Sequence, residues 1–255
     1  MRVLPPQIQP PESPTRRRHK PEPLQHWSAY RSCLRWDFGF TCSFCLLHEC
    51  DFFGEIGGEG LGVTTAEHRI PRSVDSDREA EYSNCIYACR LCNRARSYRP
   101  VVQQGHRLLD PTMGAWAEHF KMSGDELRPV ADDSDAAYTH KAYDLDDPRK
   151  VARRELRRLV IEDRLRLLAG LEDEILALVD LADNLRNRDL QLFLRAVQGI
   201  KKLREHANRA LTDFVRFLAV PRDAPSSCRC GTVENHLLPR WLADQVLNIT
   251  EPAAS

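Results

Sequence analysis

Residues 41–45, T-C-S-F-C, and residues 88–93, A-C-R-L-C-N, decide the fold of this chain, because they hold two C-x-x-C pairs. Each pair bends on a tight turn and presents two sulfurs to a single ion, which is the arrangement that tetrahedral zinc requires. The two pairs together therefore predict one zinc site with four thiolate ligands. The predicted ligands are Cys42, Cys45, Cys89 and Cys92.

The predicted zinc is structural. Four cysteines leave the ion no open coordination position for a substrate, and a small module gains much of its folding energy from such an ion. A redox role would place one pair at a helix N-terminus in a thioredoxin-like βαβ pattern, which the flanking sequence lacks. The neighbouring residues Cys33, His48, Cys50 and Cys85 are interpreted as packing or surface positions.

Composition and charge exclude several classes of protein. The chain has 255 residues, of which 42% are hydrophobic and 29% charged, and 37 basic residues balance 37 acidic ones. A formal net charge of zero gives no global field that attracts a polyanion, so a nucleic-acid surface must be a local patch. No apolar run is long enough to span a membrane, and the first residues lack the apolar core of a signal peptide. With nine cysteines, an odd number, we expect a cytoplasmic protein with reduced thiols and no membrane partner.

Changes in composition and residue pattern divide the chain into four parts. Residues 1–25 carry repeated prolines and the basic cluster R-R-R-H-K, and are interpreted as a disordered tail. Residues 26–147 hold the cysteine pairs and mixed short elements, beginning with a short helix that ends near Gly39. Residues 148–220 read as helical, and residues 221–255 form a tail of uncertain structure.

The helical part is typical of a long antiparallel hairpin. Apolar residues recur at intervals of three and four from Leu168 to Leu185 and again from Phe193 to Leu218. The polar break N-R-D at residues 187–189 separates the two series, as a short turn between two helices would. Such stripes form either the contact between the two helices or a surface for a protein partner or a second copy of the chain.

The ends of this hairpin carry their own signals. Pro148 suits the first turn of a helix, with Asp146 or Asp147 as its cap, and Pro221 ends the second helix. The tail that follows lacks a second cysteine pair with zinc spacing. Three residues there are left without an assigned role: Cys228, Cys230 and His236.

Three further features lie beside the cysteine pairs: E-H at residues 67–68 in A-E-H-R-I-P-R-S, Asn84, and Asn93 directly after the second pair. In this order, and with arginines following, residues 40–98 resemble the zinc-bearing form of the HNH endonucleases. The resemblance implies an α+β protein, in which a zinc-stabilised ββα-metal module is followed by the helical hairpin. A looser similarity to bacterial HNH proteins covers the flanking residues but neither the hairpin nor the C-terminal tail.

The resemblance implies a metal-dependent endonuclease that hydrolyses DNA phosphodiester bonds. His68 would be the general base that removes a proton from the attacking water. Glu67 and Asn93 would bind a catalytic divalent cation, Mg²⁺ in the first place and Mn²⁺ or Ni²⁺ as alternatives. Asn84 would hold the loop that carries His68. The nearest candidates for phosphate contacts are Arg90, Arg94 and Arg96.

Several alternatives stay open at this point. Asn93 stands where the family name has histidine, which keeps an oxygen ligand but leaves the preferred metal undecided. The alternative to a nuclease is a non-catalytic, zinc-stabilised module that binds nucleic acid or docks a partner through its hairpin. A role as the effector of a bacterial defence system fits the resemblance, although no residue pattern tests it. The sequence does not decide between DNA and RNA, between a nick and a double-strand break, or between oligomeric states.

Overall fold

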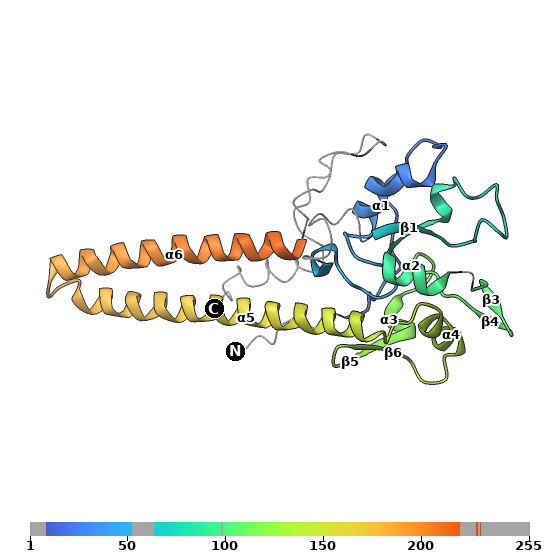
Figure 1. Cartoon of the computed structure of the whole chain (residues 1–255). Helices are drawn as coiled ribbons and strands as arrows, with labels where there is room; N and C mark the ends of the chain where they lie inside the picture. Colours follow the sequence, from blue (N-terminus) through green and yellow to red (C-terminus); the bar gives the residue numbers. More distant parts are fainter. Residues whose placement is uncertain (1–8, 53–63, 98, 220–227, 229, 231–255) are drawn as a thin grey trace.

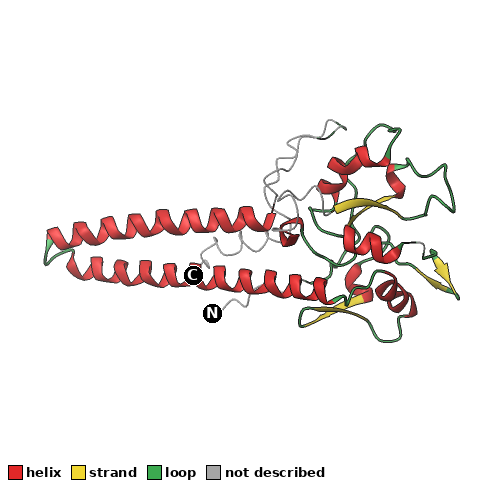
Figure 2. Ribbon diagram, viewed as in Figure 1, coloured by secondary structure: helices red, strands yellow, loops and turns green. Residues whose placement is uncertain are grey.

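The computed structural model describes residues 9–52, 64–97, 99–219, 228 and 230. It combines three two-stranded sheets and several short helices with one helical hairpin that extends away from them (Figures 1 and 2). This arrangement confirms the mixed α and β composition and the long hairpin expected from the sequence. The elements in chain order are η1 (Trp27–Tyr30), α1 (Arg31–Asp37), η2 (Glu49–Phe52), β1 (Thr64–His68), η4 (Tyr82–Asn84), β2 (Cys85–Cys89), α2 (Arg90–Arg96), β3 (Val102–Gln103), β4 (His106–Arg107), α3 (Trp116–His119), β5 (Phe120–Ser123), β6 (Glu126–Pro129), α4 (Ser134–Ala142), α5 (Pro148–Leu185) and α6 (Leu190–Ala219).

The strands β1 and β2 form an antiparallel pair that leads directly into α2. In their register, Thr64 lies opposite Cys89 and His68 lies opposite Cys85. All five residues of β2 are buried, because α1 and α2 both contact this strand while β1 pairs with it. The pair and its helix therefore form a ββα unit within the largest hydrophobic cluster of the described residues.

The helix α1 confirms the short helix expected before Gly39. The turn η1 runs into α1, which ends at Asp37, and Gly39 and Phe40 then adopt positive φ angles of 55° and 56°. A left-handed backbone of this kind reverses the chain after a helix and suits glycine best. The reversal brings the first cysteine pair back toward β2.

The ends of the hairpin follow the predicted capping signals. The Asp147 side chain accepts a hydrogen bond of 2.8 Å from the backbone N–H of Arg149, one residue into α5 after Pro148. Asp189 caps α6 in the same way through the backbone N–H groups of Gln191 and Leu192, both at 3.0 Å. The predicted stop at Pro221 lies outside the described residues. Among the described helices, none is both long and apolar enough to cross a membrane.

The first turns of α5 are buried against the ββα unit although they carry several charges. Lys150 and Arg154 are fully buried, and Arg157 is nearly so. The Arg154 guanidinium donates to the backbone oxygens of Cys45, Asp125 and Leu145 at 2.7 to 3.1 Å. These carbonyl partners explain how a charged helix packs here, because a buried guanidinium needs acceptors for its N–H groups. The hairpin is thus joined to the core at its base.

The N-terminal segment makes specific contacts around Arg17 and His19, whereas its composition predicts a disordered tail. The Arg17 guanidinium donates to the backbone oxygens of Ser83 at 3.2 Å and Cys85 at 2.6 Å. His19 is only 1% exposed. The residues that bind this segment through polar contacts are distant from it in the sequence, so its local composition does not reveal them. Residues 1–8 lie outside the described part of the chain.

Candidate functional site

The two C-x-x-C pairs meet at one buried position. Their four sulfur atoms all lie within 4.8 Å of one another, and the Sγ atoms of Cys45 and Cys89 are 3.6 Å apart. Four sulfurs at about 2.3 Å from a tetrahedral zinc are separated by roughly 3.8 Å, so the spacing fits this ion. All four thiols are inaccessible to solvent. The donor set, the spacing and the burial together fit a structural metal site, which we call the cysteine knuckle (Cys42, Cys45, Cys89 and Cys92).

Local backbone geometry presents these four ligands. Cys42 and Cys45 lie on a turn in which the Leu46 N–H donates to the Cys42 oxygen at 3.0 Å, and Leu46 has a φ of 62°. An isolated antiparallel bridge between Thr41 and His48 closes this turn. Cys89 ends β2, and its Sγ accepts the N–H of Cys92 at 3.4 Å in the first turn of α2.

Buried cations from α5 lie beside the cysteine knuckle. Zinc with four thiolates carries a net charge of −2, which is costly to bury without compensation. Burial alone would lower the pKa of Lys150, but the nearby cysteine sulfurs raise it above its ordinary value. Arg154 reaches the backbone oxygen of Cys45 at 3.1 Å. The base of the hairpin therefore supplies positive charge that would stabilise an anionic metal site here.

His68 ends β1 and its ring is held on two sides. Its Nε2 lies 3.0 Å from the backbone oxygen of Glu79, and the Trp27 ring meets the imidazole edge to face at a centroid distance of 5.4 Å. A carbonyl oxygen can only accept, so Nε2 carries the proton in the neutral ring and Nδ1 keeps its lone pair. Burial lowers the pKa of His68, and this effect outweighs the opposing hydrogen bond to Glu79. The imidazole is therefore available as a base near neutral pH.

Glu67 is buried and paired with Arg96 of α2. The Arg96 guanidinium donates to Oε1 of Glu67 and also to the backbone oxygens of His68 and Arg69. Burial raises the pKa of the Glu67 carboxyl, against the opposing charge of Arg96. The hydrogen bond from Arg96 engages one of the two carboxylate oxygens, Oε1.

The buried side chain of Asn84 closes the loop that follows His68. Its Oδ1 accepts the N–H of Ile70 at 2.8 Å, while its Nδ2 donates to the backbone oxygens of Ile70 and Arg78, both at 3.0 Å. The backbone oxygen of Asn84 also accepts the N–H of Arg69 at 2.8 Å. The amide thus uses both its donor and its acceptor groups to join the two ends of the loop.

The polar residues of α2 divide between two environments. Arg90 and Arg94 are exposed, whereas Arg96 is 2% exposed and occupied by Glu67 and two carbonyl groups. The buried position of Arg96 does not suit the phosphate contact expected from the sequence, because helical spacing turns it inward one turn after Cys92. Asn93 is half-buried and lies three residues before Arg96, so the two share one side of the helix.

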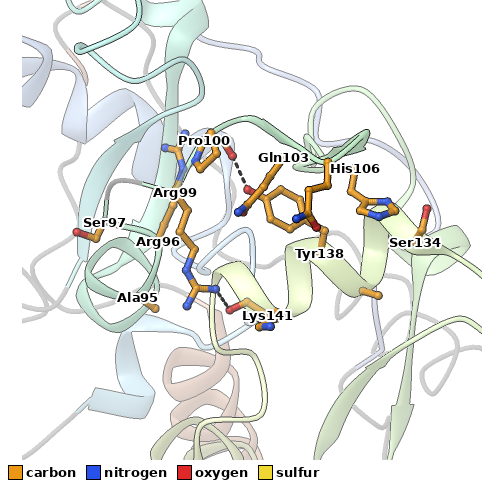
Figure 3. A pocket seen from close by; sticks show the side chains of 12 residues that line it. Ala95, Arg96, Ser97, Arg99, Pro100, Gln103, His106, Ser134, Tyr138 and Lys141 are labelled. Atoms are coloured by element: carbon orange, nitrogen blue, oxygen red, sulfur yellow. Dashed lines mark hydrogen bonds between the residues drawn. The ribbon is translucent and has the colours of Figure 1, made fainter.

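A cleft of about 730 Å³ lies beyond the C-terminal end of α2 (Figure 3). Its walls come from α2, β3, β4 and α4, and include Arg99, His106, Tyr138 and Lys141. The Tyr138 hydroxyl donates to the backbone oxygen of Pro100 at 2.7 Å across it. Glu67, His68 and Asn93 do not line this cleft, whereas Arg96, the partner of Glu67, does.

These observations describe a ββα unit with a four-cysteine metal site, an acid and histidine pair at the end of its first strand, and asparagines before its second strand and within its helix. Residues 48–99 match the family model described as HNH endonuclease, which confirms the resemblance to that family. The match begins after the first cysteine pair and does not extend to the hairpin. Comparison with curated proteins found no match, and neither did comparison with solved structures.

The structure also contains site residues that sequence reasoning did not identify. Trp27 and Glu79 hold the His68 ring, yet neither belongs to a motif. Glu79 acts through its backbone oxygen, so its side-chain type gives no signal. The pairing of Glu67 with Arg96 was accessible in principle, because an arginine one turn after Cys92 must point toward the strands.

Proposed function

We propose that this protein is a metal-dependent endonuclease that hydrolyses phosphodiester bonds in DNA. The observation that carries the proposal is the hydrogen bond between His68 Nε2 and the Glu79 oxygen, within a ββα unit that matches the HNH family. A family match alone supports nuclease activity in general and leaves the reacting groups unassigned.

His68 acts as the general base in this proposal. Because Glu79 fixes the proton on Nε2, the water that attacks phosphorus gives its proton to Nδ1. Trp27 and the Glu79 oxygen hold the plane of the ring, and Asn84 holds the loop that carries Glu79 by joining Ile70 to Arg78. The lowered pKa of His68 keeps this base unprotonated near pH 7.

Glu67 and Asn93 would hold the catalytic divalent cation. Their oxygens are of the type that Mg²⁺ prefers, and when bound the ion would neutralise charge on the scissile phosphate and the leaving oxygen. Glu67 offers Oε2 beside its ion pair with Arg96, and Asn93 lies on the side of α2 that Arg96 shares. Arg96 orients the Glu67 carboxylate, while the exposed Arg90 and Arg94 remain the candidates for phosphate contacts.

One observation favours the alternative of a module that binds nucleic acid without cutting it. The ion pair with Arg96 engages the carboxylate that the catalytic cation needs, and a bound guanidinium competes with a metal for the same charge. In this case Arg90 and Arg94 would bind phosphates, and no cation would be held at Glu67. Cleavage is therefore the property that separates the two functions.

The deciding experiment is a nicking assay on supercoiled plasmid with Mg²⁺, Mn²⁺ or Ni²⁺. We expect wild-type protein to relax the plasmid and His68→Ala to lose this activity, with unchanged zinc content and melting temperature. His206→Ala is the matched control, because His206 is exposed on α6 and lies outside the proposed site.

Two results would contradict the proposal. Cleavage by His68→Ala at the wild-type rate would remove His68 from the mechanism. A wild-type protein that shifts plasmid in a gel but never nicks it with any of the three metals would instead support the non-catalytic alternative.

The same assay with a single-stranded RNA substrate tests the choice of DNA over RNA. The expected partner surface on the hairpin and the role in bacterial defence stay predictions.

A further inference from the structure

A second group of side chains that could hold a metal ion gathers at α1 and shares no residue with the cysteine knuckle. It brings together His19, Cys33, Cys228 and Cys230, whose ligand atoms all lie within 4.8 Å of one another. His19 is 1% exposed, Cys33 0% and Cys228 7%, and Cys230 is partly buried. The family match at residues 48–99 includes none of these four residues.

The distances in this group fit shared coordination of one ion. The Sγ atoms of Cys33 and Cys230 are 3.7 Å apart, close to the roughly 3.8 Å edge of a zinc tetrahedron and to the 3.6 Å found within the cysteine knuckle. A disulfide would need about 2.05 Å, so these thiols are not bonded to each other. His19 Nδ1 lies 3.1 Å from the Cys230 sulfur.

We propose that His19, Cys33, Cys228 and Cys230 form a second structural zinc site, of the three-cysteine, one-histidine type. This donor set is one of the closed sets that hold structural zinc tetrahedrally. The ligands come from three segments that are distant in sequence: the N-terminal segment, α1 and the chain beyond α6. Such a site would link His19, Cys228 and Cys230 to α1.

The surroundings of the group support a built site. Trp36 and Phe40 pack against Cys33 and Cys228, with their rings 4.7 Å apart, and keep water from the sulfurs. Trp36 follows Cys33 by three residues, so α1 presents both to the same side. An apolar shell of this kind strengthens metal binding by thiolates because it lowers the local dielectric constant.

The backbone of His19 is held in place by contacts that do not involve the cysteines. Oδ1 of Asp37 accepts the N–H groups of Arg18 at 2.8 Å and His19 at 3.1 Å, and Oδ2 accepts the Tyr82 hydroxyl at 2.6 Å. Asp37 ends α1, the helix that carries Cys33. The histidine is therefore positioned relative to the thiols before an ion binds, which reduces the entropy lost on coordination.

The test is a metal count on the full chain, purified with a reductant and without chelator, by inductively coupled plasma mass spectrometry. We expect two zinc ions per wild-type chain and one per Cys228→Ser/Cys230→Ser chain. Cys85→Ser is the control and should keep two, because Cys85 is a buried cysteine that belongs to neither group and donates its thiol to the Glu81 oxygen. Trypsin should also cut faster after Arg16 and Arg18 in the double variant.

Other results would overturn the proposal. One zinc in both the wild type and the double variant would show that the second group binds none. One zinc together with two thiols that resist alkylation when a chain purified without reductant is unfolded would identify a disulfide instead. If the double variant does not fold, His19→Ala replaces it: the proposal requires one of its two zinc ions to pass to a colorimetric chelator faster than in wild type, and equal rates would refute it.

Discussion

Replacing Arg96 with methionine tests the contact on which the candidate catalytic strand depends. The side chain is 2% exposed, and its guanidinium donates to Oε1 of Glu67 and to the backbone oxygens of His68 and Arg69. Methionine keeps the length and much of the packing but removes the charge and all three of these hydrogen bonds. The buried carboxylate and both carbonyl groups then lose their partner.

The expected loss of stability follows from the burial of the pair. Breaking a buried ion pair by removing one partner costs about 3–5 kcal/mol, because an uncompensated charge stays in a low-dielectric site. Glu67 can limit the cost by binding a proton, and burial already raises the pKa of this carboxyl. Glu67→Gln removes the negative charge of the same pair. The decreases in the free energy of unfolding of Arg96→Met and Glu67→Gln should therefore add up to about 1–3 kcal/mol more than the decrease in the double variant.

The measurement is equilibrium unfolding in urea with zinc present in excess, followed by the fluorescence of the module's tryptophans. With a slope of about 2 kcal/mol per M, a loss of 3–5 kcal/mol lowers the midpoint by about 1.5–2.5 M. The control is Arg94→Met, since Arg94 is exposed on the same helix, and it should change stability by less than about 0.5 kcal/mol. A midpoint for Arg96→Met that coincides with the control would refute the buried pairing described above.

Other predictions concern the loop, the hairpin and the metal. Asn84→Ala should cost about 2 kcal/mol through its lost hydrogen bonds and speed tryptic cleavage at Arg72 and Arg78; unchanged proteolysis would contradict its role. Asp147→Ala should lower stability by about 1 kcal/mol through the lost cap of α5, measured by thermal unfolding. Gly170→Ala should raise it by about 0.4–1 kcal/mol, since nothing lies within 4 Å of the added methyl; a lower melting temperature would contradict this. Removing zinc with a chelator should unfold the ββα unit and abolish nicking even after Mg²⁺ is restored; a metal-free protein that still nicks would contradict a structural role.

The features that could be predicted from the sequence are those whose signals are local. The cysteine spacing, the cap at Asp147 and the polar break before α6 each involve residues within a few positions of one another. Each signal predicts a particular turn or helix end, and the structure contains all three. The order of glutamate, histidine and asparagines is similarly readable, because the ββα unit is continuous in the chain.

What could not be predicted depends on pairs that are far apart in sequence. The buried guanidinium of Arg154 looks like a surface charge until the carbonyl groups of Cys45 and Asp125 are placed around it. His19 reads as part of a basic tail, and Cys33 as a packing residue, until the chain beyond α6 returns to them. Composition shows that burying a polar group is costly. It does not show the hydrogen-bond partners that compensate for this cost, because these come together only in the folded chain.

The position of the two metal groups along the chain explains how the candidate catalytic residues are held from both sides. Asn93 directly follows Cys92, so the cysteine knuckle fixes the start of α2 and the residue proposed to hold the cation. On the other side, Arg17 lies two residues before His19 and donates to the carbonyl groups on either side of Asn84. A zinc at the second group would therefore restrain the loop after His68 through Arg17, while the cysteine knuckle restrains α2. The two proposed ions would then set the distance between the general base and the cation without touching the substrate, because each anchors the chain next to a catalytic residue.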